Sequence, residues 1–395
     1  MRKEKSKYLS IKSKTKYFTF LCIYFFLHPF CKLIYGRKRN WLICERGTDA
    51  QDNGYFFFKY LREKQPNINA VYLIKRKSKD YLKVSSLGKT VEFGSLRHFL
   101  MAIGFPVKIS SHLYGYAPWI QMATFFRRNK TKDIHVFLQH GITKNKQPGF
   151  YKTNCKSLKL FVCGAKPEYD FINSEFGYTD KTVLYTGFPR YDSLKDDSKD
   201  NSFKQILVFP TWRRYIEHMN ENDFLCSRFF NEWNKFLKDA KLLETCQQNN
   251  CQIKLCLHPS IKIFSHCFTE NKIVSIVNVD DIRVQDLINE SCMLITDFSS
   301  IFYDFAYLNK PIVYFQFDED EYYIGHYDKG YFDYRRDGFG PVSINAKDAA
   351  QNVSACIKNS FTNDQKYNGK CKNHFLLRDT KNSIRIFDEI IRLED

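Results

Sequence analysis

Short apolar runs alternate with helical patterns along most of the chain, which is typical of α/β proteins. Residues 293–295 predict a buried strand, residues 301–308 carry apolar side chains at helical spacing, and residues 312–315 predict another strand. Ser299 and Ser300 precede the predicted helix, where free backbone N–H groups can bind a phosphate. An ordinary serine N-cap is the commoner reason for such a pair, so a phosphate site needs support from the rest of the chain.

Residues 40–191 repeat this alternation and predict a parallel α/β half. In open parallel sheets, ligands gather at the carboxyl ends of the strands. Asp52 and Asn53 lie at such an end, just before a predicted helix, so both are candidates for ligand contact. The predicted strands of this half span residues 41–44, 70–74, 107–111, 135–139 and 160–163.

His140 and Gly141 follow the predicted strand at 135–139 directly. An imidazole at this edge of the sheet titrates near neutral pH, so His140 can act as a general base. Gly141 has no side chain and permits the close approach of a substrate. Two plainer interpretations stay open: His140 can be a structural hydrogen-bonding residue, and Lys144 can be a solvated charge instead of a phosphate contact.

The polar stretch at residues 192–202 lacks apolar anchors and predicts a linker between two halves. Beyond it, residues 203–340 form a second α/β half, with a long helix predicted over 224–247. Residues 341–395 show helical patterns, and we expect these helices to pack back across both halves. Two halves whose strand ends face each other would enclose a cleft.

Basic residues follow the predicted strands of the second half. Arg213 and Arg214 stand after one strand, where a guanidinium can fork onto phosphate oxygens, although a solvated pair is the plainer interpretation. His258 stands after another strand and repeats the position of His140, with Pro259 restricting its backbone.

Composition narrows the class of protein. The 395 residues are 44% hydrophobic and 17% aromatic, which allows two domains and argues against a disordered chain. A formal net charge of +18 predicts an anionic partner, whether nucleic acid, membrane lipid or phosphorylated substrate. The 13 cysteines form no pair of CxxC motifs, which indicates reduced thiols in a cytosolic protein and no zinc site. The sequence has no Walker loop, no GxGxxG and no GxSxG, and no spacing of a metal site.

The N-terminal residues 1–39 combine basic and aromatic character. Residues 2–16 are rich in lysine, residues 17–31 carry no charge, and more basic residues follow. The apolar run is shorter than a spanning helix, and no cleavage site follows it. These features favour a segment lying on an anionic membrane surface. A buried first helix of the fold and a tilted or hairpin insertion are the alternatives.

Several motifs, in this order and spacing, resemble the CDP-glycerol glycerophosphotransferase family of bacterial wall teichoic acid and capsule synthesis. The resemblance covers about residues 40–340. The motifs are Asp-Asn-Gly at 52–54, Gln-His-Gly-Ile-Thr-Lys at 139–144, Pro-Thr-Trp-Arg at 210–213, His-Pro at 258–259, Thr-Asp-Phe-Ser-Ser at 296–300, Lys-Pro-Ile-Val-Tyr-Phe at 310–315 and Gly-Tyr-Phe-Asp-Tyr at 330–334.

The resemblance implies a metal-independent GT-B fold, in which two Rossmann-like parallel-sheet domains face a cleft. It also implies a peripheral enzyme on the cytoplasmic face of the cell membrane that needs no cofactor. Such an enzyme transfers a polyol phosphate from CDP-glycerol or CDP-ribitol to a hydroxyl of a lipid-linked glycan or polyol-phosphate acceptor, and releases CMP.

The family's functional residues carry over to matching positions. His140 resembles the catalytic histidine on the acceptor side, and His258 resembles the second essential histidine, near the donor pyrophosphate. Ser299 and Ser300 resemble the pyrophosphate-binding pair. Arg213 resembles a phosphate contact, and Asp297 is placed in the same donor site, where it can also simply orient the turn. Asp52, Asn53, Gly141 and Lys144 are the candidates on the acceptor side.

One departure and two alternatives remain. Ile142-Thr143-Lys144-Asn145 replaces the family's commoner Thr-Pro-Leu-Lys, which leaves the acceptor open. A GT-B glycosyltransferase using a CMP- or UDP-sugar could share the His-Pro and Ser-Ser elements. A basic protein that binds membrane or nucleic acid without catalysis would explain the charge but not the histidines, so nucleic acid is not the expected partner.

Overall fold

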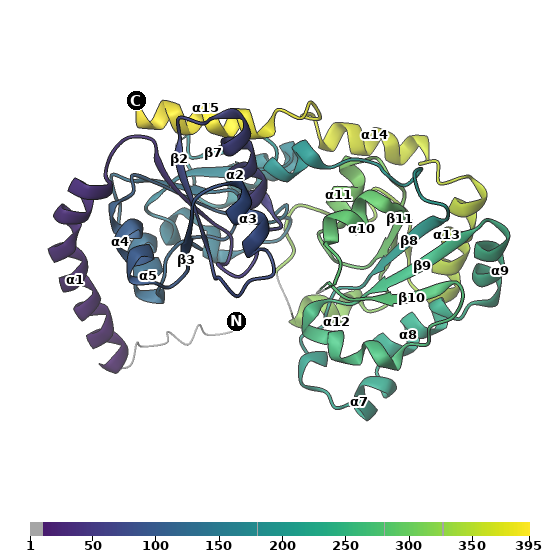
Figure 1. Ribbon diagram of the computed structural model, residues 1–395. Helices are drawn as coiled ribbons and strands as arrows, with labels where there is room; N and C mark the ends of the chain where they lie inside the picture. The colour runs from purple at the N-terminus through teal and green to yellow at the C-terminus, as the bar shows by residue number, and fades with distance from the viewer. Residues whose placement is uncertain (1–10, 180, 280, 326–327) are drawn as a thin grey trace.

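The computed structural model describes residues 11–179, 181–279, 281–325 and 328–395, with side chains from Lys14 onward. It consists of two α/β halves side by side (Figure 1). The first half contains a parallel sheet in the order β3-β2-β1-β4-β5-β6-β7. Its strands are β1 (Asn40–Cys44), β2 (Asn69–Ile74), β3 (Thr90–Glu92), β4 (Val107–Ser110), β5 (Ile134–Phe137), β6 (Leu158–Cys163) and β7 (Val183–Tyr185), and its helices are α2 (Asn53–Lys64), α3 (Tyr81–Leu87), α4 (Leu96–Gly104), α5 (Ile120–Arg128) and α6 (Lys166–Glu175).

The second half contains a parallel sheet in the order β10-β9-β8-β11-β12-β13. This arrangement confirms the predicted fold class of two parallel-sheet α/β domains. The strands are β8 (Lys204–Phe209), β9 (Cys251–Cys256), β10 (Val274–Val277), β11 (Ser291–Thr296), β12 (Ile312–Phe315) and β13 (Val342–Ser343), and the helices up to β13 are α7 (Glu221–Cys226), α8 (Arg228–Leu237), α9 (Ala240–Gln248), α10 (Val284–Glu290), α11 (Phe302–Tyr307) and α12 (Glu319–Gly325).

The helix predicted over 224–247 is wrong, because three helices occupy this region. Ser227 accepts the N–H of Phe230 through its hydroxyl and starts α8, and Asp239 accepts the N–H of Leu242 and starts α9. Each side chain satisfies a backbone donor that a continuous helix would have used itself, so each marks a new helix start.

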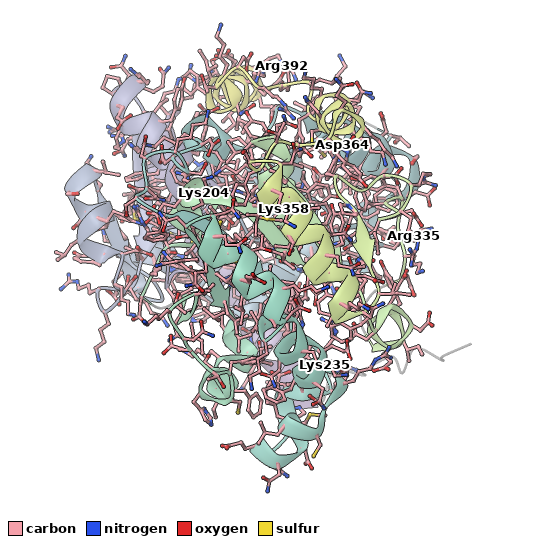
Figure 2. The ribbon with its side chains drawn as sticks, turned by 90° about the vertical axis from the view of Figure 1, so that its right-hand side faces the viewer. Lys204, Lys235, Arg335, Lys358, Asp364 and Arg392 are labelled. Atoms are coloured by element: carbon pink, nitrogen blue, oxygen red, sulfur yellow. The ribbon has the colours of Figure 1, made fainter. Side chains whose placement is uncertain are left out.

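The region 341–395 does not consist of helices alone, contrary to the prediction, although its later helices do pass back across both halves. It begins with β13, a two-residue strand paired with β12 that is too short to leave a sequence pattern. The helix α13 (Ala346–Lys358) packs on α8 and α9 of the second half, and the N–H of Ala346 at its start donates to Glu232 of α8. Figure 2 shows this side of the second half, with Lys358 at the far end of α13 and Lys235 labelled. Only the last part returns: α14 (Gln365–His374) lies over the second half and α15 (Asn382–Glu394) over the first (Figure 1).

The N-terminal helix α1 (Ile11–Tyr35) lies on the outside of the first half, against α4 and α5. It is longer than the apolar run at 17–31, and one face buries Phe20, Tyr24 and Cys31. The basic residues before position 11 lie outside the described residues. By length and composition, Lys14–Tyr35 could cross a membrane, and only a small part of it is buried in the protein.

The two halves share one apolar core. Phe57 of α2, Tyr191 of the 3₁₀ helix η3 (Pro189–Ser193), Phe302 of α11 and Ile386 of α15 belong to the same buried cluster. The contact between the halves is therefore a packed core, and it holds the carboxyl ends of the central strands close to each other.

Candidate active site

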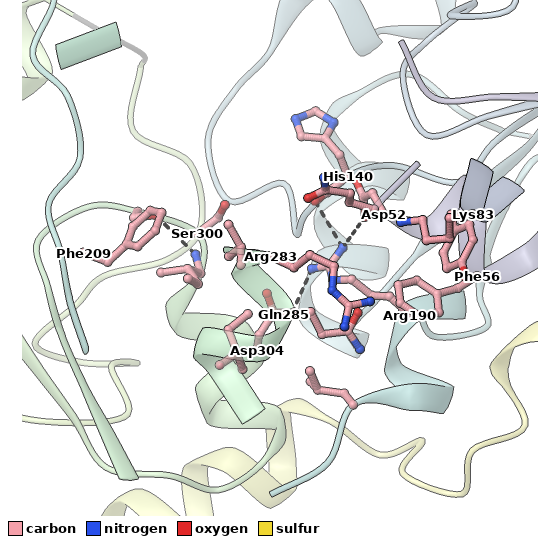
Figure 3. Close-up of a pocket in the computed structure, with 17 residues that line it drawn as sticks. Asp52, Phe56, Lys83, His140, Arg190, Phe209, Arg283, Gln285, Ser300 and Asp304 are labelled. Carbon is pink, nitrogen blue, oxygen red and sulfur yellow. Dashed lines mark hydrogen bonds and ion pairs between the residues drawn. The ribbon is translucent and has the colours of Figure 1, made fainter. Parts of the chain in front are cut away.

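A cavity of about 270 Å³ lies between the two halves. Figure 3 shows its walls: side chains from α2 and η3 and from the loop after β5 stand on one side, and the starts of α10 and α11 stand on the other. The lining residues with charged, imidazole or hydroxyl side chains are Asp52, Tyr55, Lys83, His140, Arg190, Arg283, Ser299, Ser300 and Asp304.

His140 is presented to this cavity by a strained turn. The preceding residue, Gln139, has a left-handed backbone with φ of 59° and is almost fully buried. Its side-chain amide donates to the Val162 carbonyl at 2.6 Å and to Glu168 at 3.0 Å, so the turn is held firmly. The chain then points His140 outward: the residue is exposed and lines the cavity, and Figure 3 shows its ring at the upper edge of the labelled side chains.

The surroundings of His140 favour the neutral ring. Solvent reaches it from the cavity, but burial among protein atoms lowers its pKa below the ordinary value of 6.5. Asp52 opposes that shift, whereas Arg46 and Arg190 reinforce it. A neutral imidazole at neutral pH can accept a proton, as a general base must.

A second imidazole lies parallel to the first. The His112 ring stacks on His140 with centroids 4.6 Å apart and an interplanar angle of 5°. His112 Nε2 accepts a hydrogen bond from Arg46 Nε at 2.8 Å. Burial, with His140 and Arg46 beside it, lowers the pKa of His112 to about 3. His112 is therefore neutral and fixed in one orientation.

The Ser299–Ser300 turn faces His140 from the other half. A Cβ atom at Gly141 would lie 3.3 Å from the Ser300 hydroxyl, so the halves approach each other here and glycine leaves the room. The Ser299 hydroxyl lies 3.5 Å from the Ile301 N–H, at the limit of a hydrogen bond. Both serines line the cavity, while the helix itself starts at Phe302 and is short.

Arg190 joins the walls of the cavity. Its guanidinium donates to Asp52 at 3.1 Å and to the His140 carbonyl at 3.2 Å on the first half, and to Asp304 at 2.8 Å on the second. Asp52 also caps α2 by accepting the Asn53 N–H. Asp52 thus pairs with Arg190, which also binds the His140 carbonyl, and its charge acts on the His140 ring.

Arg213 does not reach the cavity, and the prediction of a direct phosphate contact is wrong for this structure. The side chain is fully buried between Asp297, at 2.8 Å, and Asp318, at 2.8 Å. The pKa of Arg213 is raised, as the two carboxylates outweigh burial. Asp297 in turn accepts the N–H groups of Thr211 and Phe298, so it orients the turn before Ser299 and is likewise fully buried.

His258 stands apart from the cavity walls. Its Nδ1 accepts the Ser260 N–H at 3.2 Å, and its ring stacks on Trp212 with centroids 5.9 Å apart. Burial lowers its pKa, and Arg46 of the first half lowers it further. Arg46 therefore lowers the pKa of both His140 and His258, although these histidines belong to different halves.

Sequence comparison relates this geometry to known proteins. The profile of the CDP-glycerol:poly(glycerophosphate) glycerophosphotransferase family matches residues 24–392. The chain belongs to this family. The predicted resemblance is confirmed, and it extends beyond the residues 40–340 that carry the motifs.

Relatives of this family member act in teichoic acid synthesis. The minor teichoic acid biosynthesis protein GgaB of Bacillus subtilis (strain 168) is 32% identical over 374 residues, which cover 92% of this chain and 41% of GgaB. The teichoic acid ribitol-phosphate polymerase TarL of Staphylococcus aureus (strain NCTC 8325 / PS 47) is 26% identical over 223 residues, which cover 50% of this chain and 37% of TarL. The chain thus spans less than half the length of either relative.

Solved structures agree on the fold. The wall teichoic acid polymerase TagF superposes with a TM-score of 0.67 at 16% identity, covering 91% of this chain and 90% of the TagF chain. The GT-B-like architecture is therefore confirmed.

Two of the predicted acceptor-side residues of this glycerophosphotransferase family member, Asn53 and Lys144, lie in the protein interior. Asn53 is fully buried, donates to the carbonyls of Leu138 and Gln139, and accepts the Arg190 N–H. Lys144 is also buried and donates to the Phe298 carbonyl of the other half at 2.8 Å, and burial lowers its pKa to about 8. Both hold the loops of the site, and neither lines the cavity, so a direct acceptor contact is wrong for this structure.

Sequence reasoning missed Arg190 and Asp304, which line the cavity, and Arg46 and His112, which lie beside His140: the His112 ring stacks on His140 and accepts from Arg46. The rule that found His140 could have found Arg46, because Arg46 also follows the end of a strand, β1. Asp304 lies inside a helix, and its importance depends on Arg190 from the other half, so no local signal exists.

Among the residues that the structure describes, those lining the cavity form no cluster of metal ligands. Within the described residues, one trio could hold a metal ion: Glu221, His266 and Cys267, on α7 and the 3₁₀ helix η5 (Pro259–Cys267). None of the three lines the cavity. All 13 cysteines are described, and none is paired with another.

Proposed function

We propose that this chain transfers glycerol phosphate, or a related polyol phosphate, from a CDP-activated donor to a hydroxyl of a membrane-linked glycan or polyol-phosphate acceptor, and releases CMP. The observation that carries the proposal is the cavity between the halves, where neutral His140 faces the Ser299–Ser300 turn at the carboxyl ends of both sheets. Family membership supports the reaction type.

The reaction needs a base on one side and stabilisation of negative charge on the other. The acceptor oxygen attacks the β-phosphorus, the new O–P bond forms, and the bond between that phosphorus and the bridging oxygen of CMP breaks. His140 takes the proton of the attacking hydroxyl, and CMP leaves with the bonding electrons. Such phosphoryl transfer depends mainly on positioning and electrostatics.

The donor side is the Ser299–Ser300 turn together with His258. The unliganded surroundings lower the pKa of His258, so the ring is neutral at neutral pH without substrate. A bound pyrophosphate beside it would raise that pKa, because an anion favours the charged ring. His258 can then donate a proton or a strong hydrogen bond to departing CMP.

We further propose that α1 holds the protein on the cytoplasmic face of the membrane, as a peripheral element lying parallel to the surface. Phe20 and Tyr24 pack on α5, and Lys32 forms an ion pair with Asp133, so one face of the helix is committed to the fold. The opposite face exposes Phe25, Phe26 and other apolar side chains.

The test uses the full chain with CDP-glycerol or CDP-ribitol and a lipid-linked acceptor, and follows CMP release and product mass. We expect a phosphodiester product. His140→Ala should fold and lose about 10²–10⁴-fold in kcat, the usual contribution of a general base. A glycosidic product from a CMP- or UDP-sugar would replace the proposal with glycosyl transfer, and salt-sensitive nucleic-acid binding without turnover would overturn an enzymatic role.

A further inference from the structure

We propose that Arg46 is the arginine that binds the donor phosphates in this cleft, and that His112 is a positioning residue that aligns Arg46 with His140. The proposal rests on the proposed function, since it names a residue for the phosphate side of that reaction. It arises from a question that the fold leaves open: Arg213 is enclosed by two carboxylates and cannot supply the cation.

The contact between Arg46 and His112 fixes the state of the imidazole. An arginine N–H only donates, so His112 Nε2, at 2.8 Å from Arg46 Nε, must be the unprotonated nitrogen. A neutral ring with its proton on Nδ1 follows. The same ring lies parallel to His140 at 4.6 Å, so one side chain sets the direction of the guanidinium and the plane of the base.

Arg46 keeps most of its donors free. Its Nε is used by His112, whereas its two terminal nitrogens have no partner within the part of the chain that the structure describes. The two arginines that line the cavity are occupied: Arg190 by Asp52 and Asp304, and Arg283 by Asp286. A guanidinium with two free terminal groups matches the oxygens of a phosphate.

The backbone around Arg46 is held in place. The Glu45 carboxylate, almost fully buried, accepts the N–H groups of Gln51, Asp52 and Tyr55 at 2.8–2.9 Å. On the other side, Gly47 has φ of 79°, a conformation that other residues rarely adopt. The loop therefore offers a preorganised cation, which is the arrangement that stabilises developing charge most effectively.

The position of Arg46 suits both steps of the reaction. The groups facing His140 are Asp52, Arg46, Arg190 and the His112 ring from the first half, with Ser300 from the second. Arg46 disfavours the protonated form of His140 and of His258 in the empty site. A bound phosphate would neutralise Arg46, so donor binding itself would make His140 a better proton acceptor.

The experiment measures nucleotide binding without turnover, by calorimetry with CMP and CDP-glycerol, on the full chain. Arg46→Ala should weaken CMP affinity about 10- to 100-fold, the loss of charge-assisted hydrogen bonds. Arg46→Lys should recover only part of this, because an ammonium cannot fork. The matched control is Arg76→Ala, an exposed arginine of the same half, which should bind like the wild type.

Two further measurements separate positioning from simple folding. His112→Phe keeps a ring on His140 but removes the acceptor for Arg46, so its kcat should fall. Adding Arg46→Ala to His112→Phe should lower kcat little further, because the two residues act together. Arg46→Ala should move the acid limb of the kcat/KM profile to higher pH, because His140 loses a neighbouring positive charge.

The outcomes are distinct. CMP affinity within twofold of wild type in Arg46→Ala, with an unmoved acid limb, would overturn this proposal and leave the proposed function intact. If the wild type binds UMP and a UDP-sugar instead of CDP-glycerol, the proposed function fails. The role of Arg46 is then decided by whether Arg46→Ala weakens UMP affinity to the same extent. Binding of neither nucleotide would overturn both.

Discussion

Two arginines of this protein lie in opposite surroundings. Arg213 is enclosed, with Asp297 and Asp318 each 2.8 Å from its guanidinium and aromatic rings of Phe298 and Tyr322 about it. Arg46 is exposed, and its two terminal nitrogens have no partner among the described residues, so they are free for a ligand. Arg213 helps to hold the turn before Ser299, because its partner Asp297 also accepts the backbone N–H of Phe298 in that turn.

This difference predicts the outcome of Arg213→Ala. The variant leaves two buried carboxylates without a partner, so the free energy of unfolding should fall by about 3–5 kcal/mol. Urea unfolding of the full chain measures it. The matched control is Arg214→Ala, which removes an exposed neighbour and should change stability by less than about 0.5 kcal/mol. A stable Arg213→Ala protein that only loses nucleotide affinity would contradict the structural role.

The charge of Asp52 predicts a shift in pH dependence. Asp52 raises the pKa of His140, so Asp52→Asn should lower that pKa and keep the ring neutral to more acidic pH. The acid limb of kcat/KM should therefore move to lower pH in CMP-release assays between about pH 4 and pH 9. Asp49→Asn, in the same loop, should leave the limb in place. A shift to higher pH would contradict His140 as the base.

At the scale of elements, α1 is divided between two surroundings. Its inner face joins a buried cluster with α4 and α5 and is tied by Lys32 to Asp133 and to the Gly104 carbonyl. On its outer face Phe25 is 62% and Phe26 is 72% exposed. A patch of this kind is costly in water and marks a contact surface, and the lysines around it suit an anionic leaflet.

Replacing Phe25, Phe26 and Phe30 together by serine should therefore weaken membrane binding at least about tenfold, since each buried phenylalanine contributes about 1.5–3 kcal/mol. Cosedimentation with vesicles containing anionic lipid measures the loss. Ile263→Ser, which removes another exposed apolar side chain far along the chain, is the control. Retention of the wild-type protein in membranes after alkaline extraction would instead indicate a spanning helix.

At the scale of the whole molecule, one packed core and one arginine hold the halves together. The apolar cluster runs through α2, η3, α11 and α15. Beside it, Arg190 pairs with Asp52 of one half and Asp304 of the other while lining the cavity. The side chains of Arg190 and Asp304 are only 11% and 8% exposed, so these charges depend on each other.

Arg190→Ala should consequently separate the walls of the cavity. Two carboxylates would face each other without a cation, and we expect a loss of about 3–5 kcal/mol in the free energy of unfolding. Adding Asp304→Asn to this variant should restore part of the loss, because the coupled charge is removed. Arg283→Ala, an exposed arginine of the same cavity, serves as the control. Equal stability of the wild type and Arg190→Ala would contradict the bridge.

Much of this architecture could be predicted from the sequence. The alternation of strands and helices around residues 40–191 and 203–340 is a local pattern, and it predicted two parallel sheets. The position of His140 after an apolar strand was also local, because the end of a parallel strand faces the ligand edge. Short elements such as β13, and helix starts such as Ser227 and Asp239, were beyond that pattern.

The sequence by itself determined which residues stand at strand ends, and hence that His140, His258 and the serine pair belong to one edge of each sheet. Only the tertiary structure decided which of these side chains stay free. Arg213, Asn53 and Lys144 are taken up by partners from distant parts of the chain, whereas Arg46 meets His112 and remains open. Burial and pairing depend on neighbours in space, and a charged side chain is available to a ligand only where the fold gives it no other partner.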